Sequence, residues 1–189
     1  VGPYTAGNDV DYGPVVTAAA KQNILGLVQT GIDQGATLVV DGRDFNLQGY
    51  EDGFFVGPHL FDNVTPDMDI YKKEIFGPVL STVRAETYEE AINLAIDHEY
   101  GNGTAIFTRD GDTARDFANR INIGMVGINV PIPVPLAYHT FGGWKKSVFG
   151  DLNQHGPDAF KFYTRTKTVT SRWPSGLKEG GEFNFKPMD

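Results

Sequence analysis

Hydrophobic and polar positions alternate with a helical period in the first part of the chain. Between Val16 and Gln34, apolar residues recur every four positions. This spacing predicts one amphipathic helix that ends near Gly35. The next segment, Thr37–Val40, is short, apolar and rich in β-branched residues, which favours a buried strand. A helix followed directly by such a strand is typical of an α/β protein.

The same order of elements returns twice downstream. Thr87 and Glu90 have the spacing of a capping box, which predicts that a helix begins there. Asp112 predicts the start of the following helix. The stripes expected to face the core are Ala91, Leu94, Ala95 and His98 in the first helix, and Ala114, Phe117, Ala118 and Ile121 in the second. Short apolar segments predict strands at residues 54–56, 60–64, 78–84, 104–108 and 125–130.

Helices that alternate with apolar strands predict an α/β fold with a mostly parallel sheet flanked by helices. Parallel strands need crossover connections, and helices usually provide them. We expect this folded part to cover residues 1–155. The segment from Phe160 to Trp173 alternates polar and β-branched residues, which predicts an edge strand. An exposed edge of that length favours pairing with a second copy, so residues 156–174 are predicted to form an oligomerisation strand and residues 175–189 a flexible tail.

The composition excludes several classes of function. A net charge of −8 disfavours binding to nucleic acid, and no apolar stretch is long enough for a membrane span. The chain has no cysteine, which excludes disulfides, thiolate metal sites and a cysteine nucleophile within these 189 residues. The four histidines are His59, His98, His139 and His155. They lack the spacing of metal ligands, so no metal is predicted.

One motif carries the functional hypothesis. Glu74-Ile-Phe-Gly-Pro-Val79 precedes a predicted strand and resembles a segment of the aldehyde dehydrogenase superfamily. In that family the matching Glu binds the hydroxyls of the nicotinamide ribose and the matching Phe packs beside the nicotinamide. The resemblance therefore implies that Glu74 and Phe76 contact the cofactor NAD. A carboxylate can accept two hydrogen bonds from a vicinal diol, and an aromatic face can restrict a planar ring.

Three further segments resemble the same family. Residues 100–108, with the sequence YGNGTAIFT, match a turn between helix and strand whose glycines suit a tight connection. Residues 124–129 match a strand whose final residue, Asn129, either contacts the substrate or ties down a loop. Residues 141–147 match a segment near the end of these enzymes, where Thr140 replaces the usual proline. Phe141 is either a substrate-pocket residue at the aldehyde entrance or a core residue.

The resemblance also implies a reaction. In the family a cysteine thiolate attacks an aldehyde, a hydride passes to NAD, and water or coenzyme A resolves the thioester. Residues 129–136, 150–153 and 162–173 resemble the branch that uses coenzyme A as a co-substrate. We therefore expect the C-terminal part of a homo-oligomeric enzyme, without its nucleophile and inactive alone. Such an enzyme would be cytoplasmic, or mitochondrial in a eukaryote. Two alternatives are a relative that does not use coenzyme A, and an inactive assembly module.

Overall fold

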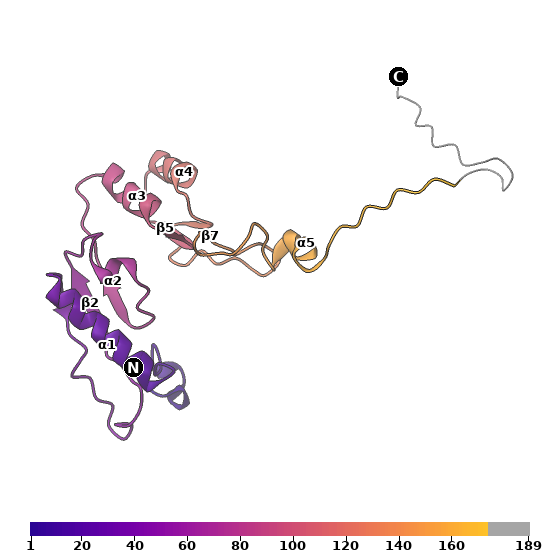
Figure 1. Cartoon of the computed structure of the whole chain (residues 1–189). Coiled ribbons are helices and arrows are strands. Elements are labelled where there is room, and N and C mark those ends of the chain that lie inside the picture. The colour runs from indigo at the N-terminus through magenta and orange to yellow at the C-terminus, as the bar shows by residue number, and fades with distance from the viewer. Residues whose placement is uncertain (174–189) are drawn as a thin grey trace. The chain divides into compact units, whose positions relative to one another are not determined.

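The computed structural model describes residues 1–173 (Figure 1). The chain divides into two compact units. The first comprises Val1–Val134 and Gly142–Phe149, and the second comprises Pro135–Phe141 and the chain from Gly150 onward. The mixture of helices and short strands confirms the α/β class. No helix within residues 1–173 is both long and apolar enough to cross a membrane.

The helices of the described chain are short, apart from the first. They are α1 (Ala18–Asp33), α2 (Asp69–Lys72), α3 (Tyr88–Asp97), α4 (Gly111–Arg120) and α5 (Ala159–Tyr163), with 3-10 segments η1 (Tyr4–Asp9) and η2 (Gly156–Asp158). The strands are β1 (Thr37–Val40), β2 (His59–Asp62), β3 (Val79–Ser81), β4 (Tyr100–Gly101), β5 (Gly103–Ile106), β6 (Met125–Ile128) and β7 (Trp144–Lys145).

The first sheet has the order β1-β2-β3 and packs its inner face against α1. Thr17 caps α1, because its side-chain oxygen accepts a hydrogen bond from the Ala20 amide at 3.1 Å. Ile24 and Val28 of α1 are fully buried with Phe61 of β2, whose side chain is 0% exposed. The opposite face is open to solvent at the strand edge, where Leu80 is 65% exposed. Since β2 is the central strand, Phe61 anchors the sheet to the helix.

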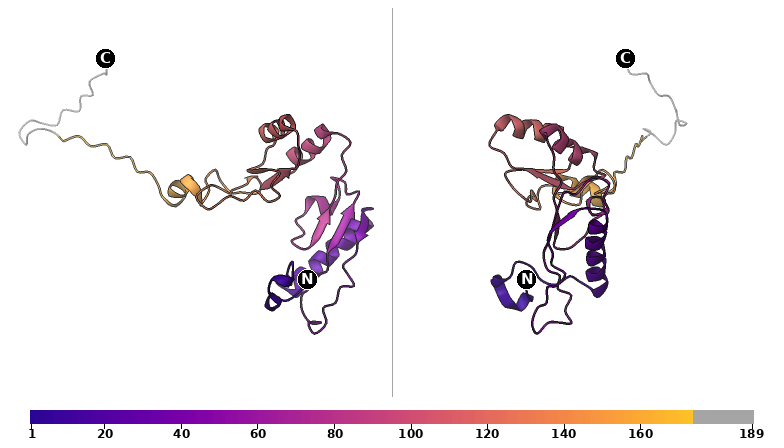
Figure 2. Two further views of the ribbon diagram at one scale, coloured as in Figure 1. Left: turned by 180° about the vertical axis from the view of Figure 1, so that it is seen from behind. Right: turned by 90° about the vertical axis from the view of Figure 1, so that its left-hand side faces the viewer.

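A second core lies between α3, α4 and the parallel pair β5 and β6. Figures 1 and 2 show α3 and α4 side by side on one face of this pair. Ile92 of α3 and Phe117 of α4 are buried together, with Ile106 and Val126 packed against them. Arg120 joins the two helices on the surface through ion pairs with Glu89 and Asp116.

The helix starts are partly as predicted. Thr87 caps α3 by accepting a hydrogen bond from the Glu90 amide, as the capping box requires. The Glu90 carboxylate, however, accepts from the amide of Glu86 rather than that of Thr87. The cap of α4 is Asp110 and not the predicted Asp112. The Asp110 carboxylate accepts hydrogen bonds from the backbone amides of Asp112 and Thr113. The predicted stripe of α3 is wrong at Ala91, which is exposed, and it omits Ile92, which is the buried residue of this helix.

The prediction of a mostly parallel sheet is wrong in its details. The structure has three small sheets: β2–β3 and β5–β6 are parallel, whereas β1–β2 and β4–β7 are antiparallel. The long connection between β1 and β2 contains no crossover helix, which is the usual link between parallel strands. Strand β2 runs antiparallel to β1. Residues 54–56 do not form a strand, although Phe55 and Val56 are buried.

The segment from Phe160 to Trp173 differs from the predicted edge strand. Phe160–Tyr163 belong to α5, so the prediction of a strand is wrong for these residues. Residues 164–173 are exposed and belong to none of the strands assigned within residues 1–173. An oligomerisation strand for this part of the chain therefore stays a prediction. The predicted flexible tail at residues 175–189 lies outside the described residues.

The buried side chain of His59 predicts that the stability of the fold depends on pH. Its side chain is 3% exposed, and neither ring nitrogen has a hydrogen-bond partner of normal geometry within residues 1–173. Burial lowers the pKa of His59, although the Gly57 backbone and Asp41, 3.9 Å away, act in the opposite direction. The unfolded chain takes up a proton as the pH falls below about 6.5, whereas the folded chain takes it up only at lower pH.

We therefore expect the free energy of unfolding to fall as the pH drops below about 6.5 and to level off below the folded-state pKa of His59. Urea unfolding of the wild type and of His59→Gln at several pH values measures this contribution. The wild type should lose more stability on acidification than the variant. His139→Gln, at an exposed position, is the control and should retain the wild-type slope. Equal slopes in all three proteins would contradict the prediction.

Candidate functional site

The motif that contains Glu74 forms a closely packed loop between α2 and β3. Ile70 of α2, before Glu74, and Ile75, directly after Glu74, are buried in the first core. Gly77 packs so closely on α1 that a Cβ atom there would lie 2.5 Å from Cδ1 of Ile24. Because the loop is held at both ends by apolar contacts, the direction of the side chains between them is fixed by the core.

Phe76 has a backbone conformation that is rare for a bulky residue. Its φ angle is 57°, in the left-handed region, and its side chain is 79% exposed. A residue with a Cβ atom loses about 1 kcal/mol or more in this conformation, and such strain is often found at functional sites. The neighbours Ile75 and Gly77 pack inward, so the loop presents the Phe76 ring outward at the expense of local backbone energy.

Glu74 lines a cleft of about 520 Å³ within the first unit. The cleft is formed by Tyr71, Lys72, Lys73, Glu74, His98, Tyr100, Asn102, Lys146 and Ser147. The carboxylate of Glu74 has no hydrogen bond and no ion pair within the described chain, although two lysines precede it directly in sequence. Lys73 pairs instead with Asp69 at 2.7 Å, and the Lys72 ammonium donates to the Asp67 carbonyl at 2.6 Å. Both oxygens of Glu74 are therefore available to a ligand.

Two glycine-rich segments close the other side of this cleft. Strands β4 and β7 pair Gly101 with Trp144, and the Gly101 amide donates a hydrogen bond to Oγ of Ser147 at 3.0 Å. A Cβ atom on Gly143 would lie 2.9 Å from Cα of Asn102. Only glycine permits this approach of backbone to backbone. The contact explains why residues 100–102 and 143–147, far apart in sequence, meet beside Glu74.

Lys145 fastens this glycine-rich junction to α3. Its ammonium donates to three carbonyl oxygens at the end of the helix: Ala95 at 3.3 Å, Ile96 at 2.7 Å and His98 at 2.9 Å. The last carbonyls of a helix lack partners within the helix and carry its partial negative charge. The backbone of Lys145 is also left-handed, with φ 54°. The lysine therefore acts as a charged cap supplied from a distant segment.

Lys145→Met should lower the free energy of unfolding by about 2–3 kcal/mol, because a half-buried, charged hydrogen-bond donor is removed and three carbonyls lose their partner. Lys146→Met is the matched control: the neighbouring lysine is exposed and only pairs with Glu99 on the surface, so its loss should cost less than about 1 kcal/mol. Chemical denaturation of both variants gives the comparison. Similar losses in the two proteins would show that the cap contributes little.

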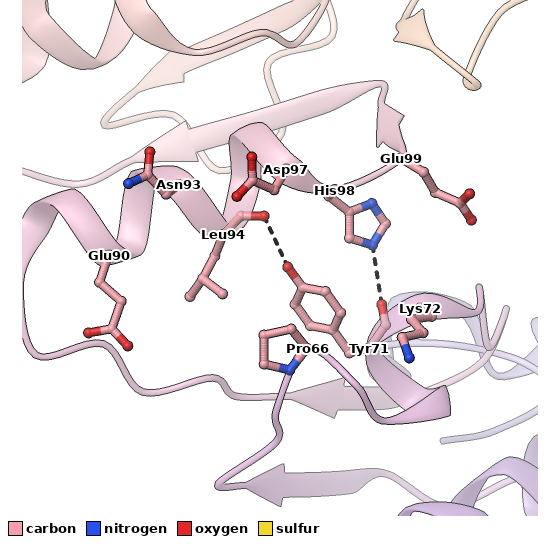
Figure 3. Close-up of a pocket in the computed structure, with 9 residues that line it drawn as sticks. All are labelled: Pro66, Tyr71, Lys72, Glu90, Asn93, Leu94, Asp97, His98 and Glu99. Atoms are coloured by element: carbon pink, nitrogen blue, oxygen red, sulfur yellow. Dashed lines mark hydrogen bonds between the residues drawn. The ribbon is translucent and has the colours of Figure 1, made fainter.

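Tyr71 and His98 connect α2, which precedes the Glu74 loop, to the end of α3 (Figure 3). The Tyr71 hydroxyl donates to the Leu94 carbonyl at 3.0 Å, and Nε2 of His98 lies 3.3 Å from the Tyr71 carbonyl oxygen. Nδ1 of His98 accepts from the Tyr100 amide, which fits a neutral ring with its hydrogen on Nε2. These contacts separate the Glu74 cleft from an adjoining pocket of about 610 Å³, which shares Tyr71, Lys72 and His98 with it.

Comparison with known proteins identifies the family. A model of the Aldehyde dehydrogenase family matches residues 1–169. The chain belongs to the aldehyde dehydrogenase family. It is 59% identical over 180 residues to a malonate-semialdehyde dehydrogenase of Pseudomonas aeruginosa, covering 95% of this chain and 36% of that protein. It is 51% identical over 165 residues to an acylating, mitochondrial methylmalonate-semialdehyde dehydrogenase of Arabidopsis thaliana, covering 87% of this chain and 27% of the relative.

Solved structures of aldehyde dehydrogenases share the fold. A Sinorhizobium meliloti protein assigned as a methylmalonate-semialdehyde dehydrogenase, solved in complex with NAD, has a TM-score of 0.87 and 73% identity and covers 94% of this chain and 36% of that one. A Pseudomonas syringae aldehyde dehydrogenase with NAD and octanal has a TM-score of 0.74 and 35% identity and covers 87% of this chain and 33% of that one. The chain thus spans about a third of the length of these relatives.

The structure brings only some of the predicted site residues of this aldehyde dehydrogenase chain together. Glu74 lines the cleft and Phe76 lies two residues beyond it, exposed. Asn129 ties down a loop, because its amide group exchanges hydrogen bonds with the backbone N–H and C=O of Thr108 at 2.9 and 3.0 Å. Of the two roles open to Asn129, the structure supports the structural one.

Phe141 belongs to the second unit and is half-buried. Its ring packs against His155, with the ring centres 4.1 Å apart. Sequence reasoning missed Lys145 and Ser147, which the junction places at α3 and in the cleft. Both follow the Gly142-Gly143 pair, and the only local signal was the pair itself, since glycine can mark a close backbone approach.

Proposed function

We propose that this chain is the part of an NAD-dependent, coenzyme A-acylating methylmalonate- or malonate-semialdehyde dehydrogenase that binds the nicotinamide half of the cofactor. Two findings support this proposal. The relatives with the names of such enzymes are 51–59% identical to the chain over most of its length. A solved relative of 73% identity was crystallised with NAD.

The observation that carries the proposal is the unpaired carboxylate of Glu74 in its cleft. A vicinal diol presents two hydroxyl donors, and a carboxylate can accept both. The cleft volume of about 520 Å³ suits part of a nucleotide. The exposed Phe76 ring offers an apolar face that would limit where a nicotinamide lies. NAD, when bound, accepts a hydride from the substrate; the chain's role is to hold the ribose and exclude other orientations of the ring.

The covalent step requires a residue that this chain does not contain. A thiolate is the nucleophile that the family resemblance implies, and none of the 189 residues is cysteine. We therefore expect no NAD reduction when the purified chain is mixed with methylmalonate semialdehyde, NAD and coenzyme A. A rate above that of a heat-inactivated sample would contradict this expectation.

A chimaera gives the positive test of the proposal. In the chimaera, this chain replaces the matching third of the Sinorhizobium meliloti relative, to which it is 73% identical. We expect NAD reduction with methylmalonate semialdehyde and release of an acyl-coenzyme A product. Oxidation of the aldehyde to a free acid, unchanged by coenzyme A, would instead favour the non-acylating alternative. An inactive but folded chimaera would contradict the proposed function.

The remaining predicted contacts belong to the same proposal. We infer that Phe141 lines the aldehyde entrance. For Asn129 we infer a supporting role in substrate binding, because it holds the backbone at Thr108. The exposed residues 164–171 lie outside the strands of the described chain, and we infer that they assemble a homo-oligomer by adding a strand to a neighbouring sheet. Sedimentation of the chimaera with and without residues 164–173 measures this contribution.

A further inference from the structure

The cleft that contains Glu74 has two walls, which come from segments far apart in sequence. The first wall is residues 71–74, at the end of α2 and in the loop that follows. The second wall combines Tyr100 and Asn102 with residues 146–147. Within residues 1–173 no strand pairs across the cleft, because β3, after the first wall, pairs only with β2, and β4 pairs only with β7. Side-chain contacts therefore set the spacing of the two walls.

His98 reaches both walls with one ring. Its Nε2 lies 3.3 Å from the carbonyl oxygen of Tyr71 in the first wall, and its Nδ1 accepts a hydrogen bond of 3.2 Å from the Tyr100 amide in the second. The ring also packs against both tyrosines, with its centre 5.2 Å from the Tyr71 ring and 5.9 Å from the Tyr100 ring. In a neutral imidazole one nitrogen donates and the other accepts, so the ring holds the two backbones at one separation.

The end of α3 provides one further attachment for each wall. The Tyr71 hydroxyl of the first wall donates to the Leu94 carbonyl at 3.0 Å (Figure 3). Lys145, directly before residues 146–147 of the second wall, donates to three later carbonyl oxygens at the same end of the helix. The last carbonyls of a helix have no partner within it, so side chains from other segments can bind them. Both walls are therefore attached to a single helix end.

We propose that His98, Tyr71 and Lys145 are positioning residues for NAD: they attach both walls to the end of α3 and so set the width of the cleft in which Glu74 holds the ribose. This inference rests on the proposed function and deepens it, because it names the residues that give the Glu74 site its affinity. Glu74 is exposed, so a ribose bound to it is confined by the opposite wall. A looser cleft loses binding energy that is equal in the ground state and the transition state, which raises KM and leaves kcat unchanged.

Tyr71→Phe tests the positioning role with little change to the fold, because it removes one hydroxyl and its hydrogen bond to α3. In the chimaera we expect KM and the dissociation constant for NAD to rise about three- to tenfold, with kcat within about twofold of the wild type. His98→Phe keeps a ring but removes both ring nitrogens, and it should raise both constants by about tenfold.

Tyr88→Phe is the matched control for Tyr71→Phe. Tyr88 is also half-buried, and its hydroxyl donates at 2.9 Å to Asp116 of α4, outside the cleft lining. The two variants should lose similar amounts of stability in urea unfolding. Only Tyr71→Phe should weaken the binding of NAD, because only its hydroxyl attaches a wall of the cleft.

Hydrogen exchange in the isolated chain measures the attachment without any cofactor. The amides of Tyr100 and Gly101 belong to β4, at the second wall, and each donates to a side chain. Tyr71→Phe changes only the first wall. It should nevertheless speed the exchange of both amides, because the end of α3 joins the two walls. Tyr88→Phe should leave both exchange rates at the wild-type value.

The positioning role is overturned if Tyr71→Phe and His98→Phe bind NAD as the wild type does, or if Tyr88→Phe weakens binding equally. Unchanged exchange at β4 in Tyr71→Phe would overturn it too. Glu74→Gln in the same titrations separates this inference from the proposed function. If Glu74→Gln alone weakens NAD binding, the proposed function stands and the positioning role fails. If Glu74→Gln keeps the wild-type affinity, the ribose assignment fails, and the exchange rates still decide whether α3 joins the walls.

Discussion

Glu74→Gln is expected to weaken NAD binding to the chimaera by roughly 10- to 100-fold while leaving its fold intact. The amide keeps the size of the carboxylate but loses its charge and one of its two acceptor oxygens. Hydrogen bonds to a charged group contribute about 1.5–3 kcal/mol, which corresponds to this range of affinity. The side chain makes no hydrogen bond or ion pair within residues 1–173, so its replacement should not change the free energy of unfolding measurably. Calorimetric titration with NAD gives the affinity.

Glu86→Gln is a suitable control for the loss of charge, because Glu86 is exposed and lies outside the cleft lining. This variant should bind NAD as the wild type does. If Glu74→Gln also retained wild-type affinity, the carboxylate would have no role in holding the ribose. If it lost both affinity and folding stability, the residue would be structural, contrary to the open geometry of its side chain.

Phe61→Ala should lower the free energy of unfolding by about 3–5 kcal/mol, the usual cost of removing a fully buried aromatic ring. Phe61 lies at the centre of the first core, in the same cluster as Ile24 of α1 and Ile70 and Ile75 beside the Glu74 loop. We therefore expect the variant to loosen this loop as well as the sheet. Urea unfolding measures the stability, and hydrogen exchange at the amides of residues 70–77 measures the loop.

Leu80→Ala removes a side chain from the opposite, open edge of the same sheet and should change stability by less than about 0.5 kcal/mol. If Phe61→Ala destabilised the chain no more than Leu80→Ala does, the packing of α1 on β2 would not be the main support of this sheet. If Phe61→Ala accelerated hydrogen exchange in α1 but not at residues 70–77, the packing of the core would not control the Glu74 loop.

The elements best predicted from the sequence are those set by local chemistry. The helix expected between Val16 and Gln34 is α1 at Ala18–Asp33, because a regular apolar stripe and a threonine cap act within a few residues. Strand β1 forms at Thr37–Val40 as predicted, but the prediction that it is buried is wrong, because Val39 and Val40 are exposed. Strand pairing was predicted less well, because parallel or antiparallel order depends on contacts between distant segments. The helix α5 in place of a strand is one result of this limit.

In the candidate site, too, the residues with a local motif were predicted, and those that depend on contacts between distant segments were not. Glu74 was found through its motif, and the structure adds the cleft that this residue lines. Lys145 was not found, because its role exists only when the glycine-rich segments meet and bring its ammonium to the end of α3. The role of Asn129 depends likewise on β5 and β6 lying side by side, which places Thr108 within hydrogen-bonding distance. Single residues of this kind have no periodic signal in a sequence.

A crystal structure of the chimaera with NAD would test the central claim most directly. We predict that both carboxylate oxygens of Glu74 lie within about 2.7–3.2 Å of the ribose hydroxyls, with the Phe76 ring in contact with the nicotinamide. A structure in which NAD is bound, but Glu74 faces solvent and other residues hold the ribose, would contradict the assignment.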